Sequence, residues 1–363
     1  MEPLKLSFSK NFVKDSFKLI ELSTPEQIQA FESGNTLVIK GLEDDEAVLC
    51  TEYKTFAIRQ MHISNSVLLV NKDEDCYLAR DNVSSTIDLQ PCLARLGRID
   101  GLLSGTCYEG ESNEENTKSK TFYTFEELLS IVQASEKELR KGLEERGVFE
   151  YKGYCRTFEK TWLFRLFDSF ITNALVHTLD IQNITLDIAK DCVMEEKEAI
   201  GEDEYIPDEI MKAAFSVFAI IRDDNVLKFD EVKICRFLGE WLLSNPRDKK
   251  WRLEEFLQVW KTLGHDIFIP KLEYIDGLFI TEERIKMQQK EQHIRYFPAS
   301  ELSTDAAKRF FTLFQAKERW TLEEITPFLM DLAPMEKERE SLLFKFARIS
   351  RVGNTVYYTS RIK

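Results

Sequence analysis

The cations near the C-terminus are the clearest candidates for chemistry in this sequence. From Ser341 onward there is no aspartate or glutamate, and two tyrosines, Tyr357 and Tyr358, lie among the basic residues. Lysine and arginine neutralise phosphate groups, and such contacts carry no information about base sequence. We predict a site for single- and double-stranded DNA without sequence preference, with a solvated basic face as the alternative. Its residues are Lys345, Arg348, Arg351, Arg361 and Lys363.

A second charged cluster lies on a predicted helix near residue 140. Its four cations are balanced by four glutamates, so the helix has little net attraction for phosphate but can complement a surface of mixed charge. The eight residues are Lys137, Arg140, Lys141, Arg146, Glu136, Glu138, Glu144 and Glu145. The pattern favours a protein partner, which we expect to contact Lys137, Arg140 and Lys141.

Motifs for catalysis or metal binding are missing from the sequence. There is no Gly-Lys dipeptide and therefore no phosphate loop, so we do not expect ATP hydrolysis by this chain. The four histidines are widely spaced, and the seven cysteines form no Cys-x-x-Cys pair. We expect no enzyme, no cofactor and no metal site.

Composition and charge restrict the class of protein further. A chain of 363 residues with 43% hydrophobic and 31% charged residues is typical of a globular protein of two to three domains. The net charge of −14 disfavours a protein that coats nucleic acid with its whole surface, although it leaves room for a local basic patch. Residues 303–363 carry +3 of this charge and the preceding residues −17.

The sequence contains no evident membrane segment or secretory signal. Its longest strongly apolar stretch, 213–221, is too short to cross a bilayer. An odd number of cysteines without close spacing indicates free thiols in a reducing compartment. We therefore expect an intracellular protein that does not interact with membranes.

The first part of the chain has the pattern of a β domain. Between Asn35 and Val70, four short runs rich in β-branched or aromatic residues follow one another about every ten residues, which favours a meander or barrel. These runs are 36–39, 47–50, 55–58 and 67–70. A polar, acidic run at 109–119 has no apolar residue and is predicted to be a linker after a β-rich domain of residues 1–108.

Amphipathic helices are predicted after this linker. They include 159–177, 206–222 and 230–244, and the acidic tract 195–209 is expected to be a solvated loop.

A short motif occurs three times in the same part of the chain. An aromatic residue at 123, 251 or 320 is followed by threonine or arginine, one apolar residue and two glutamates. In the first and third copies, Thr124 and Thr321 are predicted N-caps, and Glu127 and Glu324 complete capping boxes. A second helix and a hairpin follow, at Lys152-Gly153 and at Gly353-Asn354, and this order is that of a winged helix.

The sequence therefore predicts an α+β fold, with an N-terminal β-barrel-like domain followed by three tandem winged helices. The first occupies 120–180 and the basic third one 301–363. Between them, 181–300 holds a helical segment and a second winged helix, with a short helix at 272–277. Three unrelated helix starts are the alternative explanation of the motif.

Two groups of residues resemble a known family, the sister-chromatid cohesion proteins called "defective in sister chromatid cohesion". These proteins are accessory subunits of an alternative clamp loader related to replication factor C. The C-terminal group is 309–310, 313–314, 320, 323–325, 327, 345–348 and 359–361. The N-terminal group is 47–50, 54–55 and 64–70.

The resemblance implies partners and a location. The N-terminal domain would fold together with the large clamp-loader subunit and its very small companion subunit, forming a joint barrel. The first winged helix would help to bind the catalytic subunit of DNA polymerase epsilon, and the later ones DNA, in the nucleus. The resemblance leaves open whether the second winged helix contacts DNA and whether the complex loads or unloads the sliding clamp.

Two other classes remain open at this point. A winged-helix transcription or chromatin factor would fold without partners and select a DNA sequence, and an enzyme would carry catalytic residues that form no recognisable motif. The adaptor differs from both because its N-terminal domain needs a partner.

Overall fold

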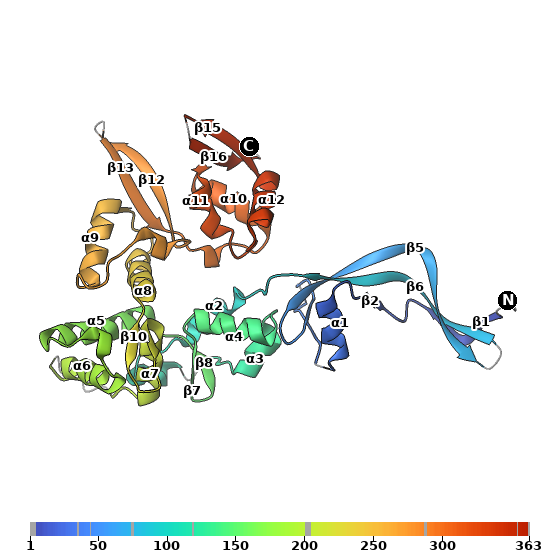
Figure 1. Ribbon diagram of the computed structural model, residues 1–363, viewed down its shortest axis with the longest axis horizontal. Helices are drawn as coiled ribbons and strands as arrows, with labels where there is room; N and C mark the ends of the chain where they lie inside the picture. The colour runs from blue at the N-terminus through green and yellow to red at the C-terminus, as the bar shows by residue number, and fades with distance from the viewer. Residues whose placement is uncertain are drawn as a thin grey trace. The chain divides into compact units, whose positions relative to one another are not determined.

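The computed structural model describes residues 5–34, 36–43, 45–73, 76–117, 120–199, 205–286, 289–353 and 355–361 (Figure 1). The chain forms two compact units. The first consists of Met1–Ile99 and Thr124–Leu143, and the second of Asp100–Tyr123 and Glu144–Lys363. The secondary structure is mixed α+β, which confirms the predicted class. The boundary divides the predicted first winged helix, 120–180, between the two units.

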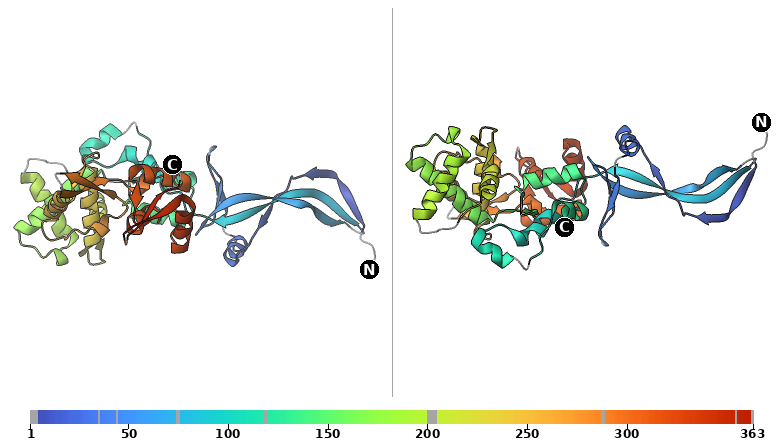
Figure 2. Two further views of the ribbon diagram at one scale, coloured as in Figure 1. Left: turned by 90° about the horizontal axis from the view of Figure 1, so that it is seen from above. Right: turned by 90° about the horizontal axis from the view of Figure 1, so that it is seen from below.

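The strands of the first unit form one open sheet with the order β1-β6-β5-β4-β3, and β2 also pairs with β6. Figures 1 and 2 show, in blue, the long ribbon of β5 and β6 with β1 beside its free end. No described strand closes this sheet, so the barrel predicted for the N-terminal domain is not formed by this chain's described residues alone. The strands are β1 (Leu6–Lys14), β2 (Leu19–Glu21), β3 (Val38–Lys40), β4 (Val48–Cys50), β5 (Thr55–Asp73) and β6 (Cys76–Pro91).

Two of the four predicted strands, 55–58 and 67–70, are parts of the single strand β5. The polar residues between them suggested a turn, but they form an irregularity within the strand. His62 pairs with Ser85, and Val67 pairs with Val83. Between these two pairs β5 advances by five residues, whereas β6 advances by two. A bulge of this kind accommodates extra residues without ending the strand.

The core of the first unit is small. Leu49, Phe56 and Leu89 are buried together between the sheet and α1 (Pro25–Glu32). A capping box at Thr24 and Gln27 starts this helix, and the Gln27 amide also donates to Leu89 O at 2.7 Å.

Two further helices, α3 (Phe125–Ile131) and α4 (Glu136–Glu145), follow the short helices α2 (Arg98–Leu103), η1 (Ser104–Thr106) and η2 (Glu111–Thr117). The structure confirms the predicted capping box of Thr124 and Glu127 and a similar pair, Ser135 and Glu138, at the start of α4. The hairpin of β7 (Phe149–Tyr151) and β8 (Tyr154–Arg156) turns at Lys152-Gly153, as predicted.

The second unit contains three successive copies of a similar order of elements: each begins with a helix, continues through a short element and further helices, and ends with a hairpin. The first copy is α5 (Lys160–Val176), η3 (Ile181–Asn183), α6 (Leu186–Ala199), α7 (Asp208–Phe218), β9 (Ala219–Ile221) and β10 (Leu227–Phe229). The second is α8 (Glu231–Ser244), β11 (Trp251–Arg252), α9 (Leu253–Leu263), η4 (Leu272–Ile275), β12 (Phe279–Lys286) and β13 (Gln289–Tyr296). The third, which follows η5 (Ala299–Glu301), is α10 (Ala306–Ala316), β14 (Arg319–Trp320), α11 (Leu322–Ile325), η6 (Thr326–Phe328), α12 (Glu336–Phe346), β15 (Ala347–Val352) and β16 (Thr355–Ser360).

The first of these copies differs from the sequence prediction. The helix expected at 206–222 ends at Phe218, and its last residues form β9. The β-branched residues Ile220 and Ile221 favour a strand over a helix end. The acidic tract expected to be a loop at 195–209 is helical at its start, up to Ala199, and again from Asp208, whereas 200–204 lie outside the described residues.

The repeated aromatic residue has a common role in strand pairing. Trp251 pairs with Ile294 in β13, Trp320 pairs with Tyr358 in β16, and both indoles are buried. Tyr123 O accepts a hydrogen bond from Cys155 N in β8 at 2.8 Å. Trp251 and Trp320 thus belong to short strands that pair with a hairpin just before a helix begins, whereas Tyr123 makes one main-chain hydrogen bond to its hairpin.

Candidate nucleic-acid and protein interfaces

Four of the five predicted DNA contacts lie in the third copy, and Lys363 lies outside the described residues. Lys345 is in the last turn of α12, Arg348 and Arg351 are in β15, and Arg361 follows β16. All four side chains are exposed. The structure therefore brings a helix end and a hairpin together as one basic region.

Arg348 lies two residues beyond α12, which ends at Phe346. Ala347 has an extended backbone, with φ −116° and ψ 158°, because the chain enters β15 there. Side chains alternate along a strand, so Arg348 and Arg351, three positions apart, point to opposite faces of the hairpin. A DNA backbone that lies against one face of the hairpin can contact only one of these two arginines. A DNA groove that encloses the hairpin can contact both.

Arg361 has a structural role as well as a charge. Its Nη1 donates to Phe344 O at 2.9 Å and to Lys345 O at 3.0 Å. These carbonyls belong to the last turn of α12, where a helix lacks internal donors and a cation is favourable. The guanidinium also lies over the ring of Phe344, which is 78% exposed.

The other half of α12 disfavours contact with phosphate. Glu336, Glu338 and Glu340 are exposed, and the Arg339 guanidinium is bonded to Ala333 O and Pro334 O. Acidic residues suit the positive end of the helix dipole but repel nucleic acid. Any DNA site must therefore use the C-terminal end of α12 and the hairpin.

The predicted polymerase contacts lie on α4 and are exposed, but all three already interact with this chain. Arg140 binds Glu136 at 2.7 Å and stacks on the Phe125 ring, 4.0 Å from its centroid. The Lys137 ammonium lies 5.4 Å from the centroid of Tyr53. Lys141 is exposed on the same helix. This charged face of α4 thus belongs to the same compact unit as the N-terminal sheet.

A buried polar network, which sequence reasoning missed, attaches α3 and α4 to that sheet. Lys40 in β3 is 6% exposed and donates from Nζ to Ala134 O at 2.6 Å and to Val132 O at 3.5 Å. Gln133 donates from Nε2 to Lys40 O at 3.2 Å, and Thr55 donates to Glu138 at 2.6 Å. Burial lowers the pKa of Lys40 below its usual 10.5.

We expect Lys40→Met to destabilise the first unit by about 1–3 kcal/mol, because two buried carbonyls lose their donor. Burial lowers the folded pKa of Lys40, so the folded chain binds this proton less tightly than the unfolded chain. The native chain should therefore gain stability relative to Lys40→Met as the pH rises from that lowered pKa towards 10.5. Hydrogen exchange at residues 132–139 measures the difference. The exposed Lys54→Met is the control, and equal effects of both changes would contradict the role of the network.

The N-terminal sheet exposes many apolar side chains. On the described surface, exposed large apolar residues occur on both outer strands and on the long ribbon. They include Leu6, Phe8 and Val13 on β1, Val38 and Ile39 on β3, and Met61 and Val70 on β5. Beyond Ala57, β5 pairs with β6 alone, so one of its edges is unpaired among the described strands from Ile58 onward. Apolar surface and a strand edge of the first unit are thus left uncovered by the described residues.

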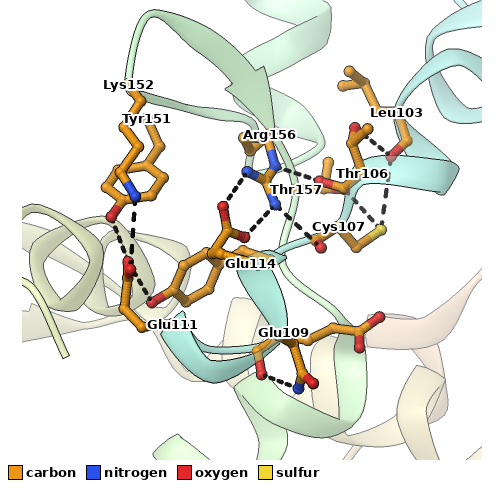
Figure 3. A network of polar contacts seen from close by, with 12 residues as sticks. Leu103, Thr106, Cys107, Glu109, Glu111, Glu114, Tyr151, Lys152, Arg156 and Thr157 are labelled. Atoms are coloured by element: carbon orange, nitrogen blue, oxygen red, sulfur yellow. Dashed lines mark hydrogen bonds and ion pairs between the residues drawn. The ribbon is translucent and has the colours of Figure 1, made fainter. Parts of the chain in front are cut away.

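The acidic run at 109–119 is more than a solvated linker. Residues Glu111–Thr117 form η2, and Arg156, which is 2% exposed, donates to both carboxylate oxygens of Glu114 at 2.8 and 3.1 Å (Figure 3). The same guanidinium donates to Thr106 O and Cys107 O, and the Tyr151 hydroxyl donates to Glu111. Glu114 of this run therefore neutralises a buried arginine, and Glu111 accepts from the neighbouring hairpin.

Among the described residues, no three His, Cys, Asp or Glu residues cluster as metal ligands, and no helix there is long and apolar enough to cross a bilayer.

The features above define a mixed α+β protein with an exposed apolar sheet and separate charged surfaces. The chain belongs to the sister chromatid cohesion protein Dcc1 family, whose model matches residues 17–329. It is 29% identical over 360 residues to "Sister chromatid cohesion protein DCC1" of Mus musculus, covering 95% of this chain and 87% of the relative. The protein of the same name from Saccharomyces cerevisiae is 25% identical over 382 residues, covering 95% and 97%.

Family membership confirms the resemblance recognised in the sequence and implies a role in sister chromatid cohesion. The family model ends at Leu329, before α12 and the last hairpin. The match to the yeast relative spans most of both chains.

Proposed function

We propose that this chain is a non-catalytic accessory subunit of an alternative clamp loader in the nucleus. It links loading or unloading of the sliding clamp to DNA polymerase epsilon and to DNA during replication and sister chromatid cohesion. Its partners are the large clamp-loader subunit and that subunit's very small companion.

The open N-terminal sheet is the observation that carries this proposal. An unpaired edge and exposed apolar residues on β1 and β3 would favour self-association in a chain that acts alone. Strands from the partners would complete the sheet as a joint barrel, adding main-chain hydrogen bonds and covering apolar surface. Co-purification of the full chain with the two clamp-loader subunits tests this assembly.

The repeated order of elements supports three winged helices in the second unit, and the first two of them have other bounds than the predicted 120–180 and 181–300. We assign DNA binding to the last of them, because its cations gather at the end of α12 and on its hairpin. The contacts are to phosphates, so both single and double strands bind without sequence preference.

The mixed charges of α4 support polymerase binding through Lys137, Arg140 and Lys141. Because α4 belongs to the first compact unit, this surface and the open sheet are parts of one body. Both functions of the adaptor, assembly and polymerase binding, would then lie on that body.

A further inference from the structure

The first copy in the second unit is strongly acidic. Residues 160–230 contain seven lysines and arginines and fifteen aspartates and glutamates, a net charge of −8. A surface with this charge repels nucleic acid and attracts cationic partners. The charge of this copy is therefore opposite to that of the basic third copy, and it favours a different class of partner.

One edge of its hairpin has no partner strand among the described residues. Arg222 N donates to Val226 O and Asp230 N donates to Phe218 O, with Ile220 opposite Lys228 between these two bonds. In an antiparallel ladder, bonded pairs alternate, so the main-chain groups of Ile221 point away from β10. The described two-stranded sheet ends at β9, and its outer edge offers those groups to an added strand.

A surface groove of about 610 Å³ runs along β9 and α7. Its charged residues are Glu144, Glu150, Glu209, Lys212 and Lys233, and all five are exposed. Ile220, also in the lining, is 58% exposed. The groove thus combines a free strand edge, an apolar contact and a net charge of −1, with Glu209 and Lys212 from the acidic copy and the other three charges from adjoining segments of the second unit.

We propose that this groove binds an extended, lysine- or arginine-rich segment of a partner protein as a strand added to β9. Main-chain hydrogen bonds to Ile221 supply affinity, and side chains that alternate along the added strand meet the glutamates and Ile220. A cationic segment is selected because the surrounding copy is acidic.

A ten-residue peptide of alternating lysine and valine is a suitable probe for the full chain, with binding followed by fluorescence anisotropy. Each of the charge reversals Glu150→Lys and Glu209→Lys should weaken peptide binding at least tenfold. The neutralising changes Glu150→Gln and Glu209→Gln should weaken it less. The matched control is Asp191→Lys, which reverses an exposed charge on α6 of the same copy outside the groove lining. The Asp191→Lys change should weaken peptide binding no more than about twofold, because it alters only the long-range electrostatic field at the groove.

Two further measurements separate strand addition from simple charge attraction. A peptide N-methylated at every second residue should bind at least tenfold more weakly, and the Ile221 amide should exchange more slowly in the complex. Equal binding by the methylated peptide, or an equal loss in Asp191→Lys, would overturn the proposal. Protection of the Ile221 amide by duplex DNA instead of the peptide would overturn it as well.

Discussion

Replacing Glu114 with alanine is expected to destabilise the second unit by about 3–5 kcal/mol. The change leaves the Arg156 guanidinium buried without its carboxylate, and an uncompensated buried charge is costly. Two carbonyls, Thr106 O and Cys107 O, still accept from Arg156 but do not neutralise it.

All five tryptophans (Trp162, Trp241, Trp251, Trp260 and Trp320) lie in the second unit, so urea unfolding followed by their fluorescence reports on it selectively. Glu109→Ala removes an exposed carboxylate from the same acidic run and should cost less than about 0.5 kcal/mol. Combining Glu114→Ala with Arg156→Met should cost less than the sum of the single changes. Additive losses would show that the two side chains do not act as a pair.

The second large effect is expected for DNA binding by the full chain. Neutralising a lysine or arginine that contacts a phosphate should lower the slope of log affinity against log salt by about one. At 0.15 M salt this corresponds to about fivefold per contact, so replacing Lys345, Arg348, Arg351 and Arg361 together should cost of the order of several hundredfold.

The losses should be similar on two unrelated duplexes and on a single strand, measured at several salt concentrations. A control quadruple variant at Lys308, Lys212, Lys190 and Arg165, outside α12 and its hairpin, should change the slope little. Arg361→Lys separates charge from capping, because lysine keeps the charge but not the guanidinium. Binding that survives the first quadruple change would show a merely solvated basic face, and a preference of about a thousandfold for one sequence would support a transcription factor.

Much of the chain after residue 120 could be predicted from the sequence because its signals are local. Thr124 with Glu127 and Thr321 with Glu324 form the expected capping boxes, since a cap depends on residues three positions apart. Arg252 provides no side-chain cap, as its type implies. The apolar residues at both ends of a polar segment likewise indicate the pairing of 278–280 with 294–297.

The long strands of the first unit could not be predicted in the same way. In β6, the inward positions include Asp81 and Ser85, both buried, so polar residues interrupt the apolar alternation. The Asp81 carboxylate accepts from Phe17 N at 2.7 Å and from the Ser16 hydroxyl, which attaches the segment after β1 to β6. Buried polar residues of this kind look like surface residues when only the sequence is considered.

The charged site residues show the same limit. The sequence identifies these charged residues. Whether each charge is available to a partner depends on contacts with residues far away in the sequence. Lys137 lies over Tyr53, and Glu114 pairs with Arg156, at separations of 84 and 42 residues. No periodicity encodes these pairs.

Assembly of the full chain with the large and very small clamp-loader subunits tests the central claim most directly. Co-expression and purification should yield a stable complex, and hydrogen exchange along β5 from Ile58 to Lys72 should be slower in the complex than in the chain alone. Phe8→Asp and Ile39→Asp change exposed side chains on the two outer strands, and should reduce complex recovery at least tenfold without unfolding the chain. Val176→Asp, an exposed apolar position on α5, should have no effect. A chain that stays monomeric, unfolds cooperatively and shows unchanged exchange along β5 in the presence of both subunits would contradict the account.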